Sequence, residues 1–400
     1  MTELSKIETM KSPVLRRDCA VITRVMIAAV LLAATTHVMR APTGHITRAP
    51  TGHITRAPTG HIMCCDAAST DVSLPTDFFA PPEPCDPQCI FAVSNWEVAK
   101  FHAALHKQAP STGTIELDLG TLPEYSDLTV DVGLRKPKRV SLSNEHLFVD
   151  GASLPWKFTA KVAKKKRSGV WQCYSADLDE DPEKVEGLSD VTNRPASLMP
   201  LEPVDGHQSP PTAVLGGFNM HRTKGVDPAG DTARKLDAVA SVGGGLRGKV
   251  LDVCTGLGYT ACGAASSAAT TEVVTIELDP LMVYLQRTNP WSQQLFDDDK
   301  IVRLLGDATE ILPTLPEGYF DVVIHDPPAN SMSGELYSLE VYSQIRRAMR
   351  TGGRFYHYVG DPKSQASGRL FKGILERLRE AGFDSPKKVE KAYGILAVAR

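Results

Sequence analysis

The C-terminal half of this 400-residue chain alternates between short, continuous apolar runs and longer amphipathic stretches. The runs are rich in Val, Ile and Leu, and they lie at 250–253, 273–277, 301–305, 320–325, 353–359 and 393–399. Such runs are typical of strands buried on both faces of a parallel sheet. Residues 370–381 have helical periodicity. The pattern predicts an α/β domain with a doubly wound sheet over residues 213–400.

The preceding part of the chain has a different pattern, in which apolar and polar residues alternate. The alternating runs are 114–119, 128–132, 139–142 and 147–149. Period-two runs separated by turn residues predict antiparallel strands, so we expect a small β-rich domain over residues 91–175. Residues 176–212 are acidic and contain prolines, and we expect an acidic linker there.

Acidic residues stand at the ends of four predicted strands of the C-terminal domain. Asp252 lies in the first strand, Glu277 ends the second, Asp307 follows the third and Asp326 follows the fourth. Open parallel sheets bind ligands beyond the carboxyl ends of their strands. We therefore expect these four acids to converge on one crevice, although some eighty residues of chain separate the first from the last.

A glycine turn, with Gly256 and Gly258, connects the first of these strands to a helix. Glycine lets the backbone approach a ligand closely, and the helix that follows presents unpaired N–H groups and a positive dipole end. This arrangement suits an adenosine-containing cofactor. The turn also fits the G-x-G-x-x-G/A pattern of dinucleotide enzymes.

Four motifs of the chain resemble those of class I S-adenosylmethionine-dependent methyltransferases, in the same order and spacing. They are Asp-x-x-x-Gly-x-Gly at 252–258, the acid at 277, Gly-Asp-Ala at 306–308 and Asp-Pro-Pro at 326–328. The resemblance implies a seven-stranded Rossmann-like sheet, S-adenosyl-L-methionine as the cofactor, and a transferase activity. Gly-Asp-Ala and Asp-Pro-Pro have no place in a nicotinamide dehydrogenase.

The resemblance also implies a set of cofactor-binding residues: Asp252, Gly256, Gly258, Glu277, Asp307 and Ala308. The glycine backbone is expected beside the methionine part of the cofactor, whose amino group Asp252 would support. Glu277 would hold the ribose hydroxyls. Asp307 would accept a hydrogen bond from the adenine amino group, and the backbone of Ala308 would donate one to the ring.

The chain looks closer still to a group of uncharacterised predicted methyltransferases typical of archaea. The similar segments are 220–225, 289–292, 325–328 (His-Asp-Pro-Pro), 334–338 and 355–358. This resemblance covers about residues 213–400, with a weaker echo over 91–175. It implies a cofactor and a fold but leaves the acceptor open.

The catalytic candidates are Asp326, Pro327, Pro328 and His357. Methyl transfer from a sulfonium needs no acid, so the enzyme aligns the acceptor and, for an amine or hydroxyl, removes a proton. We expect the Asp326 carboxylate and the Pro327 carbonyl to accept hydrogen bonds from the acceptor, with His357 as a second candidate base. Ala329 departs from the pattern of nucleobase and glutamine methyltransferases, which usually have an aromatic residue there.

The candidates for substrate binding are His221, Arg222, Lys224, Tyr337 and Tyr358. The three basic residues precede the first strand and could bind an anionic substrate or the cofactor carboxylate, or could instead serve helix capping or the surface. The tyrosines could replace the missing aromatic ring. The expected activity is methyl transfer to an amine or another nitrogen or oxygen nucleophile of a small molecule, a protein or an RNA.

A spermidine-synthase-like aminopropyltransferase is the alternative enzyme. Residues 336–342 resemble the Leu-Tyr/Phe-Ser-x-Glu-x-Tyr run of those enzymes, but their strand-four signature has two acids three residues apart, and Ala329 stands at the second position. A non-catalytic binding module is the alternative to an enzyme of either kind.

Composition and local charge bear on the class of protein and on its partners. A net charge of -3 with 42% apolar residues argues for a globular protein without a global preference for nucleic acid or an anionic membrane. Locally, the basic run 161–167 lies near Trp156, Phe158 and Trp171, and it suits either a solvated hairpin tip or an RNA-binding face. The sequence leaves the oligomeric state open.

The first ninety residues carry three further expectations. Residues 1–40 contain Arg16-Arg17 before an apolar run, which suggests organelle (chloroplast or mitochondrion) or secretory targeting, with a cytoplasmic protein otherwise and Met26 as another possible start. Residues 41–63 repeat Ala-Pro-Thr-Gly-His-Ile-Thr-Arg and 64–90 are rich in Cys and Pro, so both are expected to be linkers. The cysteines at 64, 65, 85 and 89 could hold zinc or a disulfide, but their spacing is loose and no metal site is expected.

Overall fold

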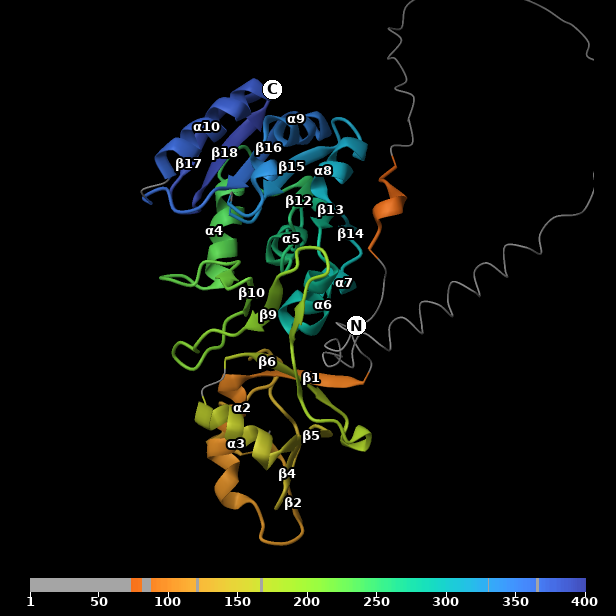
Figure 1. Cartoon of the computed structure of the whole chain (residues 1–400), viewed down its shortest axis with the longest axis vertical. Helices are drawn as coiled ribbons and strands as arrows, with labels where there is room; N and C mark the ends of the chain where they lie inside the picture. Colours follow the sequence, from red (N-terminus) through yellow and green to blue (C-terminus); the bar gives the residue numbers. More distant parts are fainter. Residues whose placement is uncertain (1–72, 81–87, 120–121, 166–167, 330, 365–366) are drawn as a thin grey trace, which may run out of the picture. The chain divides into compact units, whose positions relative to one another are not determined.

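A computed structural model describes residues 73–80, 88–119, 122–165, 168–329, 331–364 and 367–400 (Figure 1). The chain divides into two units, 1–68 and 69–400, and all described residues belong to the second. The expected targeting segment, the octapeptide repeat, and Cys64, Cys65 and Cys85 lie outside the described residues. Within the described part of the chain, the helices lack the combination of length and apolar character that a membrane crossing requires.

The C-terminal domain is built on a seven-stranded sheet with the order β14-β13-β12-β15-β16-β18-β17. Its strands are β12 (Gly248–Val253), β13 (Thr270–Glu277), β14 (Ile301–Leu305), β15 (Phe320–His325), β16 (Met349–Tyr358), β17 (Phe383–Val389) and β18 (Gly394–Ala399). The five strands from β14 to β16 are parallel, whereas β18 pairs antiparallel with β16 and β17. The predicted α/β class and the seven-stranded, doubly wound sheet are confirmed.

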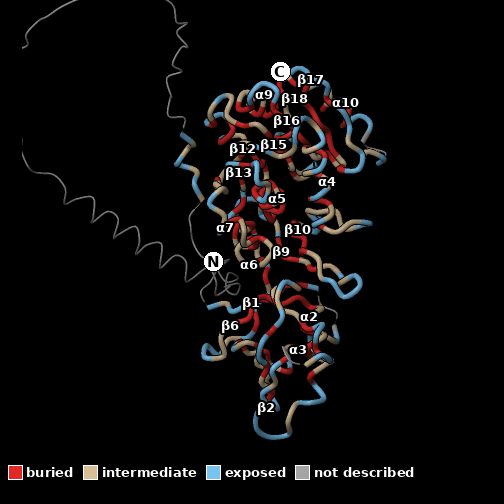
Figure 2. The backbone as a smooth tube through the Cα atoms, turned by 180° about the vertical axis from the view of Figure 1, so that it is seen from behind, coloured by how far each residue is buried: buried red, intermediate tan, exposed pale blue. Residues whose placement is uncertain are grey.

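Two separate cores cover the two faces of this sheet. Leu251 and Val253 belong to one core together with helix α9 (Leu339–Ala348) and helix α10 (Ser367–Glu380). Val250 belongs to the other, with α4 (Pro228–Ala240) and α5 (Tyr259–Ala265). Because successive strand residues point to opposite faces, a continuous apolar run is needed to fill both cores. Figure 2 shows buried positions concentrated in these strands and in α5.

The remaining helices of the C-terminal domain are short and connect its strands along the sequence. They are α6 (Pro280–Thr288), α7 (Gln294–Asp297) and α8 (Ala308–Ile311), with the 3-10 turns η6 (Pro290–Ser292), η7 (Leu312–Thr314) and η8 (Gly334–Tyr337). Asp279 caps α6 by accepting a hydrogen bond from the Leu281 backbone N–H, and Asp307 caps α8 through Thr309. Local capping thus fixes how the chain leaves β13 and β14.

The N-terminal region is β-rich but also contains two helices. One sheet has the order β1-β6-β7 and another the order β2-β3-β4-β5. Its elements are β1 (Cys89–Ser94), α2 (Asn95–Leu105), β2 (Thr114–Leu117), β3 (Val140–Ser143), β4 (His146–Val149), β5 (Ala152–Pro155), α3 (Trp156–Lys165), β6 (Val170–Tyr174) and β7 (Glu183–Lys184), with the 3-10 turns η1 (Thr76–Phe78), η2 (His106–Gln108), η4 (Pro123–Tyr125) and η5 (Ala176–Leu178). The predicted strand at 128–132 is absent, and only an isolated bridge joins Val130 to Arg135.

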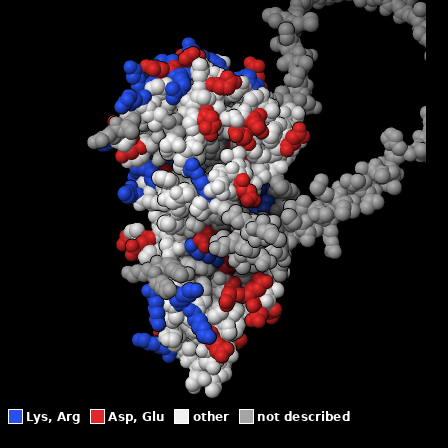
Figure 3. All heavy atoms as spheres, in the orientation of Figure 1, with Lys and Arg blue, Asp and Glu red and all other residues white. Residues whose placement is uncertain are grey.

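Two expectations for this region are corrected. The described part of the basic run, residues 161–165, belongs to α3 and not to a hairpin, because Trp156, Thr159 and Val162 are buried at the spacing of a helix. Basic and acidic side chains are interspersed on the face drawn in Figure 3.

The expected linker at 176–212 carries strands. Besides β7 it contains β8 (Glu186–Leu188) and β9 (Pro195–Met199), which form a four-stranded sheet with β10 (Thr212–Leu215) and β11 (Phe218–Asn219). Ala196 and Leu198 pack in one core cluster with Leu257 and Met282 of the C-terminal domain. These strands are too short and too often interrupted by Pro and Asp for the sequence pattern to reveal them.

Candidate functional site

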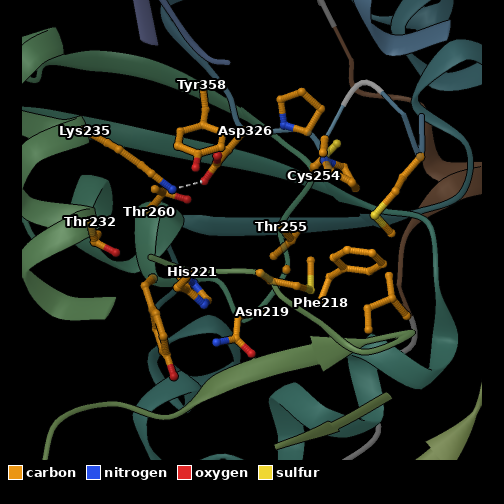
Figure 4. Close-up of a pocket in the computed structure, with 18 residues that line it drawn as sticks. Phe218, Asn219, His221, Thr232, Lys235, Cys254, Thr255, Thr260, Asp326 and Tyr358 are labelled. Atoms are coloured by element: carbon orange, nitrogen blue, oxygen red, sulfur yellow. Dashed lines mark hydrogen bonds and ion pairs between the residues drawn. The ribbon is translucent and has the colours of Figure 1, made fainter. Parts of the chain in front are cut away.

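Two adjoining cavities lie beyond the carboxyl ends of β12 to β16. One, the Glu277 cavity, has a volume of about 450 Å³ and is lined by Glu277, Asp307 and Ala308 among others. The other, the Asp326 cavity, has a volume of about 180 Å³ and is lined by Asp326, Pro327 and Tyr358 among others (Figure 4). The residues that line both are Leu215, Met220, Cys254, Gly256, Pro328 and Met332. The two cavities therefore form one crevice of the size that small ligands need.

Glu277 is held rigidly at the end of β13. Its Oε2 accepts a hydrogen bond from the Gly256 backbone N–H at 2.9 Å, and its Oε1 accepts from the N–H groups of Leu278 and Asp279, both at 3.0 Å. Burial raises the pKa of this carboxyl to about 7, although the backbone donors act in the opposite direction. Carboxylate oxygens have further lone pairs, so Glu277 can still accept from hydroxyl groups in the cavity.

Asp307 presents one oxygen to the same cavity. Its Oδ1 accepts from both the backbone N–H and the hydroxyl of Thr309, each at 2.7 Å, while within the described residues Oδ2 accepts from none. Ala308 follows at the first position of α8. Apolar side chains of Ile276, Met282 and Leu336 complete the walls. An acceptor oxygen beside apolar walls suits an amine-bearing aromatic ring such as adenine.

Glycine at position 258 lets the glycine turn form without strain. Its φ is +78°, and a Cβ at this position would lie 2.2 Å from Leu295 Cδ1. Gly256, with φ +54°, lines both cavities, whereas Gly258 lines neither and is the N-cap residue of helix α5. Gly256 thus faces the crevice, and Gly258 allows the turn to close against the core.

Asp252 is located differently from its expected position. It is fully buried and lines neither cavity. Thr260 Oγ1 donates to its Oδ1 and Thr275 Oγ1 donates to its Oδ2, both at 2.8 Å. Burial raises the pKa of Asp252 to about 7, although the two threonine hydroxyls lower it. The geometry gives Asp252 the task of holding the turn between β12 and α5, and not a direct contact with a cofactor amino group.

Asp326 is paired with a lysine that the sequence patterns did not single out. Lys235 Nζ lies 2.6 Å from Asp326 Oδ2 and 3.2 Å from Asp231 Oδ2, and its side chain is 2% exposed (Figure 4). Burial raises the pKa of Asp326, and Lys235 only partly offsets this effect. Burial alone would lower the pKa of Lys235, but Asp326 and Asp231 together raise it well above its usual range. The two carboxylates therefore favour the charged form of Lys235.

The Asp231 and Lys235 pair was available to sequence reasoning only as an i,i+4 spacing on α4. Such a pair usually marks a solvated helix face, so the spacing alone does not indicate a site. Other residues missed by the sequence patterns line the crevice as well. They are Thr192 and Arg194 from the expected linker, Phe218 and Asn219 of β11, and Thr232, Thr255 and Tyr259.

Of the three basic candidates, only His221 lines the crevice. Its Nδ1 lies 3.1 Å from Thr212 Oγ1, and burial lowers its pKa to about 3, so the ring is neutral and cannot bind an anion by charge. Arg222 pairs with Asp231 at 3.3 Å and stacks on Tyr393. Lys224 is exposed and lines neither cavity. The expectation that these three together bind an anionic group is corrected.

Two further candidates lie behind the site. Tyr337 is buried and donates to the Pro328 carbonyl at 2.9 Å, so it supports the Pro-Pro turn without lining a cavity. His357 is fully buried, with its Nε2 3.0 Å from the Tyr342 hydroxyl. Burial lowers its pKa far below the usual value. Because His357 points to the opposite face of β16 from Tyr356 and Tyr358, it does not reach the crevice, and its role as a base is corrected.

The described residues contain no group of three or more His, Cys, Asp or Glu side chains placed to hold a metal ion. The crevice does fit an adenosine-type cofactor, because it combines a carboxylate that can accept from hydroxyl groups, a second carboxylate that can accept from an amine, and apolar walls.

A family model described as guanidinoacetate N-methyltransferase matches residues 230–358. An uncharacterized protein of Methanocaldococcus jannaschii is 47% identical over 190 residues, which are 47% of this chain and 64% of the relative. Polyamine aminopropyltransferase 2 of Streptomyces coelicolor is 31% identical over 145 residues, 35% of this chain and 26% of the relative. Release factor glutamine methyltransferase of Corynebacterium glutamicum is 30% identical over 174 residues, 42% of this chain and 57% of the relative. The chain thus spans less than two thirds of each relative.

The sheet order and the family match define a Rossmann-like, class I S-adenosylmethionine-dependent methyltransferase fold. The matched stretch begins in α4 and ends with β16, so it includes the glycine turn and all four strand-end acids. The resemblance to this class, which was inferred from the motifs, is thus confirmed for the fold and the methyltransferase class.

Proposed function

We propose that the chain is an S-adenosylmethionine-dependent methyltransferase that transfers the methyl group to a nitrogen or oxygen nucleophile. The observation that carries the proposal is the junction of the two cavities at Cys254, Gly256 and Pro328. A sulfonium at this junction would have the adenosine on one side and the acceptor on the other, as an in-line displacement requires.

On the cofactor side, Glu277 would accept hydrogen bonds from the ribose hydroxyls. Asp307 Oδ2 would accept from the adenine amino group, and Ala308 would donate its backbone N–H to the ring. Gly256 would lie against the methionine part. When bound, the cofactor supplies an electrophilic methyl group on a sulfonium.

On the acceptor side, Asp326 and the Pro327 carbonyl would receive hydrogen bonds from the acceptor. Asp326 Oδ2 is engaged by Lys235, so Oδ1 is the oxygen that faces the acceptor. It would take the proton as the methyl group arrives. The Pro328 carbonyl is engaged by Ser333 and Tyr337, which hold the turn in place.

We further propose that the chain groups with its archaeal relative through the His-Asp-Pro-Pro sequence of 325–328. In that sequence the imidazole of His325 is buried, and its Nε2 lies 2.9 Å from the Leu336 carbonyl. It would anchor the following turn and leave the chemistry to Asp326.

An aminopropyltransferase is the second candidate, because polyamine aminopropyltransferases are among the relatives. Calorimetric titration of the whole chain with S-adenosylmethionine and with its decarboxylated form separates the two. Tighter binding of the carboxylated cofactor is expected for a methyltransferase and would justify a screen of cell extracts with tritiated methyl donor. Tighter binding of the decarboxylated form would overturn methyl transfer, and binding of neither would overturn both candidates.

A further inference from the structure

The Asp326 cavity already contains an ammonium group that belongs to the protein. Lys235 Nζ reaches Asp326 at 2.6 Å and Asp231 at 3.2 Å, and it lies 4.7 Å from the centre of the Tyr358 ring. Two carboxylates and the face of one aromatic ring therefore surround this ammonium group, and Asp326 accepts a hydrogen bond from it. With 2% of its side chain exposed, Lys235 is held among these neighbours at the edge of the cavity.

The charges around the cavity are balanced. Lys235 and Asp326 are the charged side chains among its lining residues, since His221 is neutral there. Behind them, Asp231 is 1% exposed and also pairs with Arg222 at 3.3 Å. Two carboxylates thus meet two cations, so this group of four side chains has no excess negative charge to attract a cationic ligand on the Asp326 side of the crevice.

The geometry also gives the two oxygens of Asp326 different tasks. Oδ2 accepts a hydrogen bond from Lys235. The Asp326 side chain as a whole is 19% exposed, and it lines the cavity. A cationic amine at Oδ1 would lie close to the Lys235 ammonium, in a buried site where like charges repel strongly. An uncharged N–H or O–H group meets no such repulsion and can still donate to Oδ1.

The rest of the lining is uncharged: besides apolar side chains and hydroxyl groups, it includes the amide of Asn219 and the neutral imidazole of His221. Met220 and Met332 contribute apolar surface. Phe218 contributes an aromatic ring, and Thr232 and Thr255 contribute hydroxyls (Figure 4). This surface suits a ligand that carries an apolar or aromatic group next to the reacting atom.

We propose that the acceptor is a molecule with an uncharged N–H or O–H nucleophile, and that Lys235 is the residue that excludes ammonium groups and polyamines. The inference rests on the proposed function. In the reaction, a lone pair of the nucleophile forms the bond to the methyl carbon while the carbon–sulfur bond breaks. The electron pair of that bond stays on sulfur, which becomes neutral, and the proton of the nucleophile passes to Asp326 Oδ1. Lys235 acts through Asp326 and is a positioning residue.

The test is calorimetric titration of the whole chain with putrescine and with spermidine, both with and without saturating S-adenosylhomocysteine. The wild-type protein is expected to bind neither polyamine at millimolar concentration. Lys235→Ala removes the internal ammonium and leaves Asp231 and Asp326 facing a space about as large as the lost part of the lysine side chain. This variant is expected to bind putrescine at least tenfold more tightly than the wild type, and Lys372→Ala, which changes an exposed lysine on α10, should behave as wild type.

A second readout separates exclusion from a purely structural role. Propylammonium has the atoms that Lys235→Ala removes beyond Cβ, so it should raise the melting temperature of this variant and leave that of the wild type unchanged. Micromolar binding of either polyamine to the wild type would overturn the proposal. If Lys235→Ala does not fold, this measurement on the wild type is the test of the proposal. A folded variant that gains no putrescine binding would overturn the role of Lys235. If the proposed function itself is wrong, the wild-type protein will not bind S-adenosylmethionine, and this result is distinct from any result with the polyamines.

Discussion

The backbone N–H of Gly256 donates a hydrogen bond to Glu277 Oε2 at 2.9 Å. This bond connects the turn after β12 to the acid that ends β13. The two residues are separated by helix α5 in the sequence, yet the parallel pairing of β12 with β13 brings their strand ends to the same edge. The position of the turn and the position of the ribose-binding candidate are therefore coupled.

Replacing Glu277 by Gln should weaken binding of S-adenosylmethionine about 10- to 100-fold, which corresponds to about 1.4–3 kcal/mol. One oxygen becomes an amide donor that faces backbone N–H groups, so the turn loses an acceptor as well as a ribose contact. Calorimetry measures the change, with Glu310→Gln at an exposed position of α8 as the matched control. Equal affinities of Glu277→Gln and wild type would contradict the role of Glu277.

Binding of adenosine ligands should weaken as the pH falls through about 7. Burial raises the pKa of Glu277 to about 7, so below this value the acceptor carboxylate becomes protonated. The probe is 5′-methylthioadenosine, because it lacks the amino and carboxyl groups of the full cofactor. Its affinity should decrease between pH 8 and pH 6 for the wild type and stay level for Glu277→Gln. A level profile for the wild type would refute the assignment.

Asp252→Asn should make the stability of the protein less dependent on pH. Burial raises the pKa of Asp252 to about 7 in the folded state, above its unfolded value, so the folded state holds this proton more tightly. The resulting stability is fully present below the unfolded pKa and is lost as the pH rises through about 7. A tenfold difference between the proton affinities of the folded and unfolded states corresponds to about 1.4 kcal/mol.

Thermal melts from pH 5 to pH 8 test this expectation for Asp252. The melting temperature of Asp252→Asn should rise relative to that of the wild type as the pH increases. A difference between the two proteins that does not change with pH would mean that Asp252 is ionised throughout.

Gly258→Ala should lower the free energy of unfolding by about 1–3 kcal/mol more than Gly318→Ala. Both glycines have positive φ, +78° and +60°, so both substitutions strain the backbone. Only at Gly258 would the new Cβ meet a buried side chain, 2.2 Å from Leu295 Cδ1, whereas nothing lies within 4 Å at Gly318. Urea unfolding of the two variants isolates the steric part, and equal losses would show that Leu295 moves aside without cost.

Asp326→Asn should reduce methyl transfer about 10²- to 10⁴-fold, because an amide cannot take the proton of the acceptor. The affinity for S-adenosylmethionine should stay within about threefold, since Asp326 lines the acceptor side of the crevice. The assay is single-turnover transfer of labelled methyl to the acceptor found in the extract screen, with Asp237→Asn on the exposed side of α4 as control. Undiminished transfer by Asp326→Asn would remove Asp326 from the chemistry.

The sequence predicted the sheet and its ligand edge well, because both depend on local patterns. The strands at 301–305 and 320–325 coincide with β14 and β15, since a continuous apolar run has few alternatives to a doubly buried strand. Glu277, Asp307 and Asp326 line one crevice because parallel strands end at a common edge. The strands between 183 and 199 were missed, because their burial against α6 depends on residues distant in the chain.

By itself, then, the amino-acid sequence determined the glycine turn, the strands and the acids at their ends, because backbone conformation follows from neighbouring residues and their periodicity. The tertiary structure alone decided which side chains meet. It brought Lys235 to Asp326 across 91 positions of sequence, turned Asp252 toward Thr260 and Thr275, and placed His357 on the face of β16 away from the crevice. Such contacts depend on how helices pack on the sheet, and no local pattern of residues encodes that packing.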